Sequence, residues 1–274
     1  MNYRKMIGLG VAGNIAGHLD QAGESIGFES DKEEENDAPK GLFPFYIPSN
    51  EGKFFEVYPI SSDTISFPEV GDNLQLEPEL GIICKVHYEN KLIKSLTPLS
   101  FGAFNDCSIR KLDVPKLSMK KNWGSNSKGI SETLIDIDKF SQGGILDNYH
   151  IVSYIRREGT LIQYGQDSPV TDYSYLYDEL LTWMVSKMNT QSDEGILEPI
   201  LNLFSHANYP DHAIIGIGAT NYTDFGKTNF LKKGDETLVV IYSNQVYDIN
   251  KIESMLESNR LIAENLSVLH QTVR

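Results

Sequence analysis

The sequence predicts an α+β fold that is mostly β, with a few peripheral helices. From residue 41 onward, short apolar runs alternate with Gly, Pro, Asn and Asp, which is typical of strands joined by turns. Only two long segments have the apolar spacing of an amphipathic helix. Hydrophobic residues make up 40% and charged residues 23% of the 274 residues, which are ordinary proportions for a globular protein.

The elements can be placed in chain order. A short strand-like run at 4–11 precedes a helix-compatible segment at 13–26 and a highly acidic segment at 29–40. The best strand predictions are 79–87, 99–109, 149–157, 160–164, 213–218 and 236–243. The two helices are predicted over 173–189 and 251–270, and the second begins with the capping-box spacing of Asn250 and Glu253. Because no repeat or linker divides the chain, we expect one domain.

The charge excludes some classes of partner. The chain has 24 basic and 38 acidic residues and a net charge of −14, which repels nucleic-acid phosphates and anionic lipid. Cys84 and Cys107 lie in apolar runs, so we expect reduced, buried thiols and no disulfide scaffold. The N-terminus lacks the continuous apolar stretch of a signal peptide or membrane span. We therefore expect a cytoplasmic protein without nucleic-acid or membrane partners.

A glycine motif near the N-terminus offers one alternative function. Gly8, Gly10 and Gly13 form a GxGxxG pattern after the first strand-like run, as in dinucleotide-binding proteins. That fold also needs a helix, a second strand and an acidic residue about 20 positions further on. Here the acidic segment fills that interval. Dinucleotide binding is therefore only the lesser alternative.

Three carboxylates form a more informative pattern. Glu77 and Glu79 flank Pro78 at the start of an apolar strand, so both side chains project from one face near a strand end. Asp106 lies in another strand-like run, where aspartate is disfavoured. Three carboxylates without thiolate or imidazole ligands select a hard cation such as Mg²⁺ or Mn²⁺. The pattern alone also permits simple pairing of these carboxylates with Lys or Arg.

Several motifs in the same order resemble the fumarylacetoacetate hydrolase superfamily. LEPELGIICKV followed by FGAFNDCSIR is similar to the family's E-x-E-L strand and N-D-x-[ST]-x-R run, which supply three metal ligands. The resemblance continues through SKGISETL, QYGQDSPV, AIIGIGAT and KKGDETLVVI, and an N-terminal N-x-x-x-H pattern ends at His18. The matched segments extend from about residue 8 to residue 243.

The resemblance implies a role for particular residues. Glu77, Glu79 and Asp106 would bind Mg²⁺ or Mn²⁺, Lys128 would be the active-site lysine, and His18 would be a catalytic base on a lid helix within 13–26. The residues expected at the substrate are Gln21, Arg110, Gln163 and Ala219. Two of these depart from the family, because Gln21 replaces a glutamate and Ala219 replaces a threonine that would bind a substrate carboxylate. Ile47 stands where the family has a lysine.

The resemblance also implies the architecture. It predicts a mixed β-sandwich roll in a single domain over 1–274, and a homodimer. We expect an N-terminal segment over about 1–60 that holds the lid helix and the acidic loop. A metal-binding β core would follow over 61–248, and a C-terminal helix would be appended within 249–274.

The implied activity is enolate chemistry on a small anionic 2-oxo or 1,3-dioxo acid. A divalent metal and Lys128 would stabilise the enolate, and His18 would act as the base. Hydrolysis of a C–C bond, decarboxylation and tautomerisation all share this enolate, so hydrolase, decarboxylase and isomerase remain open. The main alternative is a non-catalytic metal- or ligand-binding protein that keeps the scaffold.

Overall fold

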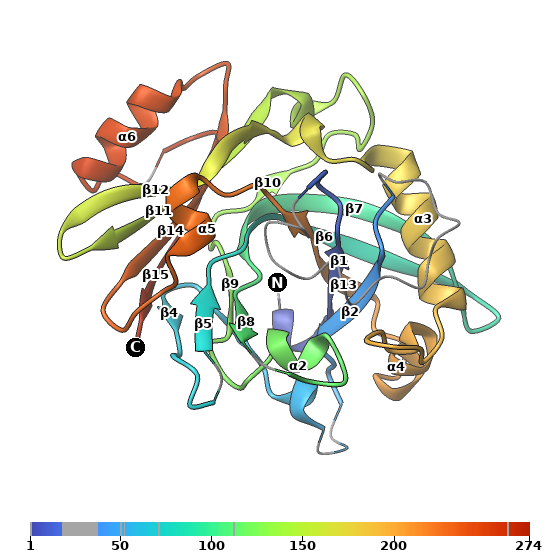
Figure 1. Ribbon diagram of the computed structural model, residues 1–274. Helices are drawn as coiled ribbons and strands as arrows, with labels where there is room; N and C mark the ends of the chain where they lie inside the picture. The colour runs from blue at the N-terminus through green and yellow to red at the C-terminus, as the bar shows by residue number, and fades with distance from the viewer. Residues whose placement is uncertain are drawn as a thin grey trace.

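Two curved β-sheets with a common core form most of the structure (Figure 1). The computed structural model describes residues 2–17, 38–49, 51, 53–70, 72–111, 113–261 and 263–274. Of the lid helix predicted over 13–26, only 13–17 belong to this part, and they form a turn. His18, Gln21 and most of the acidic segment lie outside the described residues.

The larger sheet has the strand order β2-β1-β13-β6-β7-β9-β3, and β10 also pairs with β7. Its strands are β1 (Ile7–Ala12), β2 (Gly41–Tyr46), β3 (Ile60–Ser61), β6 (Pro78–Glu89), β7 (Leu92–Asn105), β9 (Lys128–Ile130), β10 (Ile135–Asp136) and β13 (His212–Ala219). The strands β6 and β7 form a long antiparallel hairpin in which Pro78 pairs with Asn105. The start of β6 and the end of β7 are therefore neighbours.

The smaller sheet has the strand order β12-β11-β14-β15-β4. Its strands are β4 (Thr64–Ile65), β11 (Tyr149–Arg157), β12 (Thr160–Pro169), β14 (Glu236–Ser243) and β15 (Leu266–Val273). A separate two-stranded sheet joins β5 (Asp72–Gln75) to β8 (Ser108–Lys111). The strands predicted over 149–157, 160–164, 213–218 and 236–243 are confirmed.

The predicted strand 99–109 is interrupted, and the interruption matters for the site. The first part belongs to β7, which ends at Asn105, and β8 begins at Ser108. Asp106 and Cys107 lie between the two strands, where the chain leaves one sheet for another. Asp106 is therefore not on a strand, in keeping with the poor strand propensity of aspartate.

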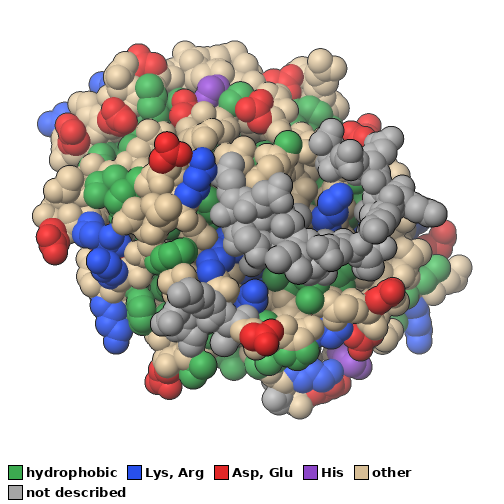
Figure 2. Space-filling view, viewed as in Figure 1, with side chains coloured by type: hydrophobic (Ala, Val, Ile, Leu, Met, Phe, Trp, Pro, Cys, Tyr) green, Lys and Arg blue, Asp and Glu red, His purple; other side chains and the backbone are tan. Residues whose placement is uncertain are grey.

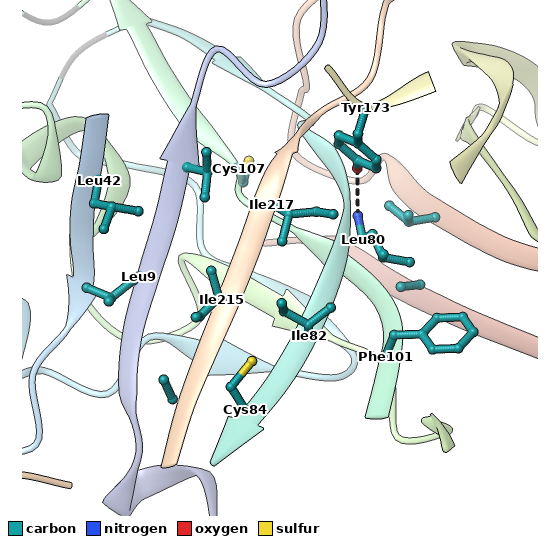
Figure 3. Packing of buried hydrophobic residues seen from close by; sticks show 14 of the residues in the cluster. Leu9, Leu42, Leu80, Ile82, Cys84, Phe101, Cys107, Tyr173, Ile215 and Ile217 are labelled. Carbon is teal, nitrogen blue, oxygen red and sulfur yellow. Dashed lines mark hydrogen bonds between the residues drawn. The ribbon is translucent and has the colours of Figure 1, made fainter. Parts of the chain in front are cut away.

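The main core lies between the facing sides of the two large sheets. Alternate residues of one strand serve different cores: Ile151 and Ile155 of β11 contact the common core, whereas Val152 and Tyr154 face the other side. Figure 3 shows part of the common core, in which side chains of β1, β2, β13, β6 and β7 lie next to one another. The hydrophobic effect over this interface holds the sheets together.

Helices pack against the sheets both at the common core and on the outer side of the smaller sheet. The helix α3 (Tyr177–Thr190) buries Leu180, Met184 and Met188 on one face and packs beside β7 and β2 (Figure 1). The helix α6 (Ile249–Glu257) lays Ile252 and Leu256 on the outer side of the smaller sheet. The shorter helices are α2 (Ser118–Lys121), α4 (Ile200–His206) and α5 (Asp224–Thr228), with 3₁₀ turns η1 (Tyr3–Lys5), η3 (Phe54–Glu56), η4 (Ile145–Asn148) and η5 (Val170–Asp172).

The predicted C-terminal helix over 251–270 is wrong in its second half. The helix ends at Glu257, and β15 completes the smaller sheet between β14 and β4. Asn259 and Asn265 have left-handed backbone conformations (φ 53° and 57°), which interrupt a helix. The cap is Asp248, whose side chain accepts a hydrogen bond from the Lys251 N–H at 2.8 Å, rather than Asn250. The C-terminal segment is thus part of a sheet and not an appended helix.

The dinucleotide alternative also fails on the structure. Gly8 and Gly10 lie inside β1 and not in a turn that leads to a helix. A Cβ atom at Gly8 would lie 2.2 Å from the Phe45 ring, and one at Gly10 would lie 2.1 Å from the Phe43 ring. These glycines therefore make room for aromatic side chains of the neighbouring strand β2.

The charged residues spread over the surface. Figure 2 shows acidic side chains scattered across the face in view, with lysines and arginines between them. Among the described residues, we find no helix whose length and apolarity would allow it to cross a membrane.

The position of β15 can be tested by a cavity mutation. Leu269 is 1% exposed and contacts the common core, so Leu269→Ala should lower the free energy of unfolding by about 2–5 kcal/mol. Val246 is 55% exposed, so Val246→Ala should change it by less than about 0.5 kcal/mol. Urea denaturation measures both, and equal effects would contradict the burial of β15.

Candidate metal centre

Three acidic side chains gather where β6 begins and β7 ends. Glu77 precedes β6, Glu79 is its second residue, and Asp106 follows β7. One carboxylate oxygen from each residue lies within 4.8 Å of the others, and all three side chains are buried. The clustering that the sequence predicted is therefore present in the structure.

Main-chain and amide hydrogen bonds fix the two chain segments against each other. The Asp106 N–H donates to the Glu77 carbonyl at 3.0 Å, and the Glu77 N–H donates to Asn105 Oδ1 at 3.3 Å. Asn105 Nδ2 in turn donates to Gln271 Oε1 of β15 at 3.0 Å. Because these groups are buried, each lost bond would leave an unsatisfied polar atom. The last strand of the chain thus supports the acidic cluster.

Glu79 is held by an irregular part of β13. The Gly218 N–H donates to Glu79 Oε2 at 3.1 Å, and Gly218 has φ 120°, a conformation that other residues rarely adopt. A Cβ atom at Gly216 would lie 2.3 Å from the same oxygen. Tyr173 fixes this region, since its hydroxyl accepts from the Leu80 N–H at 3.1 Å and donates to the Gly218 carbonyl at 2.8 Å (Figure 3). Gly216 therefore makes space for the Glu79 carboxylate, and Gly218 donates a main-chain hydrogen bond to it.

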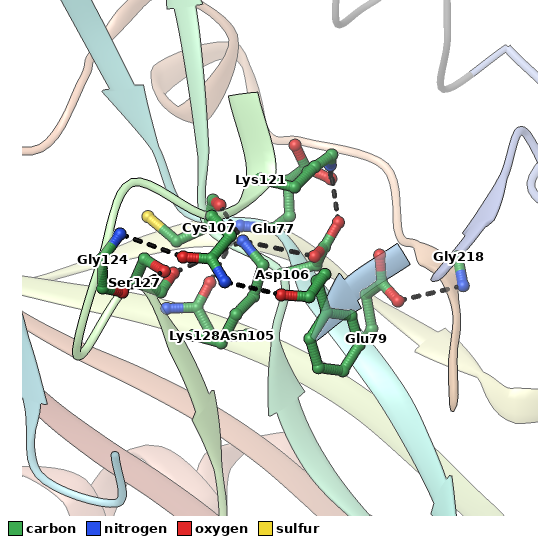
Figure 4. A network of polar contacts seen from close by, with 12 residues as sticks. Glu77, Glu79, Asn105, Asp106, Cys107, Lys121, Gly124, Ser127, Lys128 and Gly218 are labelled. Carbon is green, nitrogen blue, oxygen red and sulfur yellow. Dashed lines mark hydrogen bonds and ion pairs between the residues drawn. The ribbon is translucent and has the colours of Figure 1, made fainter. Parts of the chain in front are cut away.

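Three cationic side chains accompany the three carboxylates. Lys121 Nζ lies 2.7 Å from Glu77 Oε2 and 2.5 Å from Asp106 Oδ2, so its ammonium joins two of the carboxylates (Figure 4). Arg110 Nη2 lies 2.8 Å from Glu77 Oε1, and Lys128 Nζ lies 3.4 Å from Asp106 Oδ1. Buried carboxylates require such partners, because an isolated buried charge is very costly.

The pKa values of the cluster are shifted by burial and by the neighbouring charges. Burial raises the pKa of Glu79 well above its ordinary value, and the charges of Asp106 and Glu77 raise it further. Burial also raises the pKa of Asp106, although the ammonium groups of Lys121 and Lys128 oppose this rise. Burial lowers the pKa of Lys128, and Asp106 partly restores it. Further positive charge would therefore favour the ionised form of all three carboxylates.

A small cavity opens beside the acidic cluster. The three carboxylates form its polar side, and the other lining residues that the structure describes are Val11, Ala12, Gly13, Phe43, Leu117, Lys121 and Ala219. The apolar residues make this a poorly solvated site, in which electrostatic interactions are stronger than in water. Such a combination of a cavity with convergent charged groups is typical of a binding site.

The carboxylates fit a hard divalent cation. Oxygen ligands at about 2.1 Å around an octahedral ion lie about 3–4 Å from one another. The observed grouping within 4.8 Å meets this requirement with little movement. Asp106 Oδ1 has no hydrogen-bond partner among the described residues, although Lys128 lies within ion-pair distance. The set could therefore hold Mg²⁺ or Mn²⁺.

The other sequence-predicted site residues lie at different distances from the cavity. Ala219 lines it and pairs with Glu79 in the sheet. Lys128 is fully buried and donates to the Cys107 carbonyl at 2.5 Å, and it is not among the described lining residues. Cys107 is itself a buried free thiol, as predicted.

Arg110 and Gln163 contact the protein itself. Arg110 Nε donates to Gln75 Oε1 at 2.6 Å, and Arg110 Nη2 forms an ion pair with Glu77. This side chain therefore links Glu77 to Gln75. Gln163 Nε2 donates to the Gly165 carbonyl at 3.1 Å on β12. Their predicted contact with substrate, like the roles of His18 and Gln21, stays a prediction.

Sequence reasoning missed Lys121. It is the last residue of α2, a single turn that carries its side chain to the carboxylates and over the Phe43 ring at 5.0 Å. Lys116 and Lys120 precede it closely, and no spacing distinguishes the three lysines. The only available signal was indirect, because three clustered anions demand nearby cations.

The comparisons with known proteins give a family and a fold. A family described as "Family of unknown function (DUF5718)" matches residues 24–273. This chain belongs to the DUF5718 family. A search of curated proteins gave no significant match.

Several solved structures share the fold of this DUF5718 protein. Cg1458 with inhibitor has a TM-score of 0.57 and 16% identity, over 97% of this chain and 76% of that one. A 2-keto-3-deoxy-D-arabinonate dehydratase complexed with magnesium and 2,5-dioxopentanoate has a TM-score of 0.55 and 16% identity, over 98% and 72%. A 5-carboxymethyl-2-hydroxymuconate delta-isomerase from Mycobacterium smegmatis has a TM-score of 0.52 and 14% identity, over 97% and 78%. The predicted fumarylacetoacetate hydrolase-like fold is confirmed.

A buried glutamate holds α2, the helix that carries Lys121. The Ser118 hydroxyl, in the first turn of α2, donates to Glu198 Oε1, and Glu198 is only 6% exposed. Burial raises the pKa of Glu198 to about 7, and the bond from Ser118 limits the rise. Lys116 donates to the Leu197 carbonyl at 2.6 Å, which ties the same two segments together.

This glutamate predicts a pH dependence of stability. The folded-state pKa of about 7 exceeds the ordinary 4.5, so Glu198 costs stability increasingly as the pH rises from about 4.5 to 7. Glu198→Gln stays neutral and should therefore exceed the wild-type free energy of unfolding by about 2–3 kcal/mol above pH 7, and by little at pH 4.5. Denaturation across this pH range tests it. The exposed Glu194→Gln is the control, and a pH-independent difference for Glu198→Gln would contradict the assignment.

Proposed function

We propose that this protein is a divalent-metal-dependent enzyme that acts on a small 2-oxo or 1,3-dioxo acid through an enolate. The observation that carries the proposal is the buried group of Glu77, Glu79 and Asp106, whose oxygens lie within 4.8 Å of one another. Two structures of the same fold support it by their names. One is a 2-keto acid dehydratase complexed with magnesium and a dioxo acid, and the other is a hydroxymuconate isomerase.

The proposed cofactor is Mg²⁺ or Mn²⁺, held by the three carboxylates. Such an ion supplies Lewis-acid stabilisation of the negative charge that develops on the oxygens of an oxo acid. The protein contributes the rest of the charge balance, because Arg110, Lys121 and Lys128 already offset the three carboxylates. With a divalent ion added, the centre is positive overall and attracts an anionic substrate.

We assign the stabilisation of the developing negative charge also to Lys128. Its ammonium is fully buried beside Asp106 and has the Trp123 ring at 5.3 Å, so its charge acts in a medium that screens it weakly. The Cys107 carbonyl holds it in place. A preorganised cation of this kind lowers the barrier because it needs no reorientation during the reaction.

We propose His18 as the base that activates water or moves a proton. The segment that leads to it starts at the cavity, since Gly13 is a lining residue. Asn14 fixes this segment, because its side-chain amide donates to the Ile217 carbonyl at 2.8 Å and to the Tyr175 carbonyl at 3.0 Å. These contacts bring the chain to the acidic cluster four residues before His18.

The proposed reaction type follows from two substitutions. Ala219 lines the cavity and offers no hydroxyl to a substrate carboxylate, and Gln21 cannot act as a carboxylate partner of the base. Hydrolysis needs an activated water, whereas decarboxylation and tautomerisation do not. We therefore propose that decarboxylation or tautomerisation exceeds C–C hydrolysis. We further propose a cytoplasmic, single-domain protein that acts as a homodimer.

Metal binding is the first test of this function. Mg²⁺ or Mn²⁺ at millimolar concentration should raise the melting temperature of the wild type, because the ion binds the folded state only. Glu79→Ala should abolish this increase, since it removes one of three ligands. Differential scanning fluorimetry with and without the ion measures the shift. The control is Glu89→Ala, at the far end of β6 and paired with Lys94 on the surface. A wild type that gains nothing from either ion would refute the metal site.

Turnover is the second test. Oxaloacetate loss, acetylpyruvate cleavage and keto–enol exchange should be assayed side by side, and activity should require Mg²⁺ or Mn²⁺. His18→Ala should lower kcat by about 10²–10⁴-fold, the usual effect of losing an acid–base group, and leave metal affinity near the wild-type value. Lys128→Ala should also lower kcat. Bound metal and oxalate without turnover of any substrate would favour the non-catalytic binding protein.

A further inference from the structure

Lys121 binds one oxygen each of Glu77 and Asp106, two of the three carboxylates that could hold a metal. Its side chain is 3% exposed, and its ammonium lies 2.7 Å from Glu77 Oε2 and 2.5 Å from Asp106 Oδ2. Figure 4 shows it lying against both carboxylates, on the side away from Lys128. The ammonium thus neutralises two carboxylates that a divalent ion would also bind.

The remaining oxygens of these two carboxylates also face cations. Glu77 Oε1 lies 2.8 Å from Arg110, which is additionally bound to Gln75 at 2.6 Å and to the Tyr222 hydroxyl at 3.1 Å. Asp106 Oδ1 lies 3.4 Å from Lys128, which is bound to the Cys107 carbonyl. Arg110 and Lys128 are therefore anchored by groups outside the acidic cluster, and displacing either would break those bonds as well.

Lys121 differs from the other two cations in its access to the cavity. Of the three cationic side chains, Lys121 is the one that lines the cavity together with Glu77, Glu79 and Asp106. Lys121 lies on α2, so a change in the conformation of its flexible four-carbon stem leaves the strand pairing intact. A divalent ion bound to Glu77 and Asp106 would also repel an ammonium a few ångströms away in a buried site.

We propose that Lys121 is an internal cation that competes with the divalent metal for Glu77 and Asp106. Metal binding then requires the Lys121 ammonium to leave the two carboxylates and turn into the cavity beside Ala219. Lys121 thereby sets the metal affinity, and its released charge faces the space that an anionic substrate would enter. The inference rests on the proposed function only in that the three carboxylates bind a metal.

Calorimetric titration of the full chain with Mn²⁺ tests the competition. Lys121→Met keeps the length of the side chain but removes its charge, and it should bind Mn²⁺ at least about tenfold more tightly than the wild type. Lys128→Met is the matched control, because it removes the same charge from the same cluster at a side chain that does not line the cavity. Its affinity for Mn²⁺ should rise by less than that of Lys121→Met.

Thermal stability gives a second readout that does not depend on activity. Without metal, Lys121→Met should melt at a lower temperature than the wild type, because Glu77 and Asp106 lose a buried partner. Addition of Mn²⁺ should then raise its melting temperature by more than it raises that of the wild type. If Lys121→Met fails to fold, Lys121→Arg serves instead. It keeps the charge with a bulkier donor, and it should bind Mn²⁺ no more tightly than the wild type.

The outcomes separate this inference from the proposed function. A wild type and Lys121→Met that bind Mn²⁺ with equal affinity would overturn the competition and leave the metal site intact. If Lys121→Met binds the ion and the wild type does not, the result supports the competition between Lys121 and the metal. It also refutes the proposal that the natural protein is a metal-dependent enzyme. If neither binds it, both proposals fail. If Lys128→Met gains as much affinity for Mn²⁺ as Lys121→Met, loss of any nearby positive charge explains the gain. That result would overturn the specific role of Lys121.

Discussion

Mutual repulsion among three buried carboxylates is the constraint on which the rest of this structure depends. Glu77, Glu79 and Asp106 are brought within 4.8 Å of one another in a site that water barely reaches. Such an arrangement is unstable unless cations or protons compensate it. Arg110 and Lys121 therefore converge on the cluster from separate segments, as does Lys128. The same constraint makes the cluster suited to hold a cation.

Strand pairing and hydrogen bonds of the surrounding fold keep the three carboxylates close together. The β6–β7 hairpin fixes the register of two carboxylates against the third, and the main-chain bond between Asp106 and Glu77 locks it. The glycine-containing bulge of β13 accommodates the Glu79 carboxylate, and Tyr173 ties β13 to β6. Asn105 extends the support to Gln271 in the last strand. Glu79 lies on a strand and the other two carboxylates adjoin strand ends, and such rigid elements hold charged groups in place more accurately than loops do.

Ala219, a departure from the superfamily pattern that the sequence resembles, lies at the cavity beside the acidic cluster. Ala219 lacks a hydroxyl at the cavity, whereas the carboxylates and Lys128 are retained. Lys121 adds a cation at the same cavity. Because one fold hosts many different chemistries, the residues at the cavity, and not the fold, decide the reaction and the substrate.

The sequence by itself determined the mostly β class, most of the strands and the placement of Glu77 beside Glu79, since alternation fixes a strand and residues two apart share one of its faces. The approach of Asp106 to this pair was expected only from the resemblance to the fumarylacetoacetate hydrolase superfamily, and the pairing of β6 with β7 brings it about. Only the tertiary structure decided that the C-terminal segment is a strand. The spacing of Leu266 and Leu269 also fits the apolar face of a helix, and pairing with β14 selects the strand instead. The same holds for Gly8 and Gly10, which face aromatic rings of β2, and for Lys121, whose neighbours come from distant segments. Long-range contacts of this kind leave no periodic trace in the sequence, because they depend on where separate elements meet.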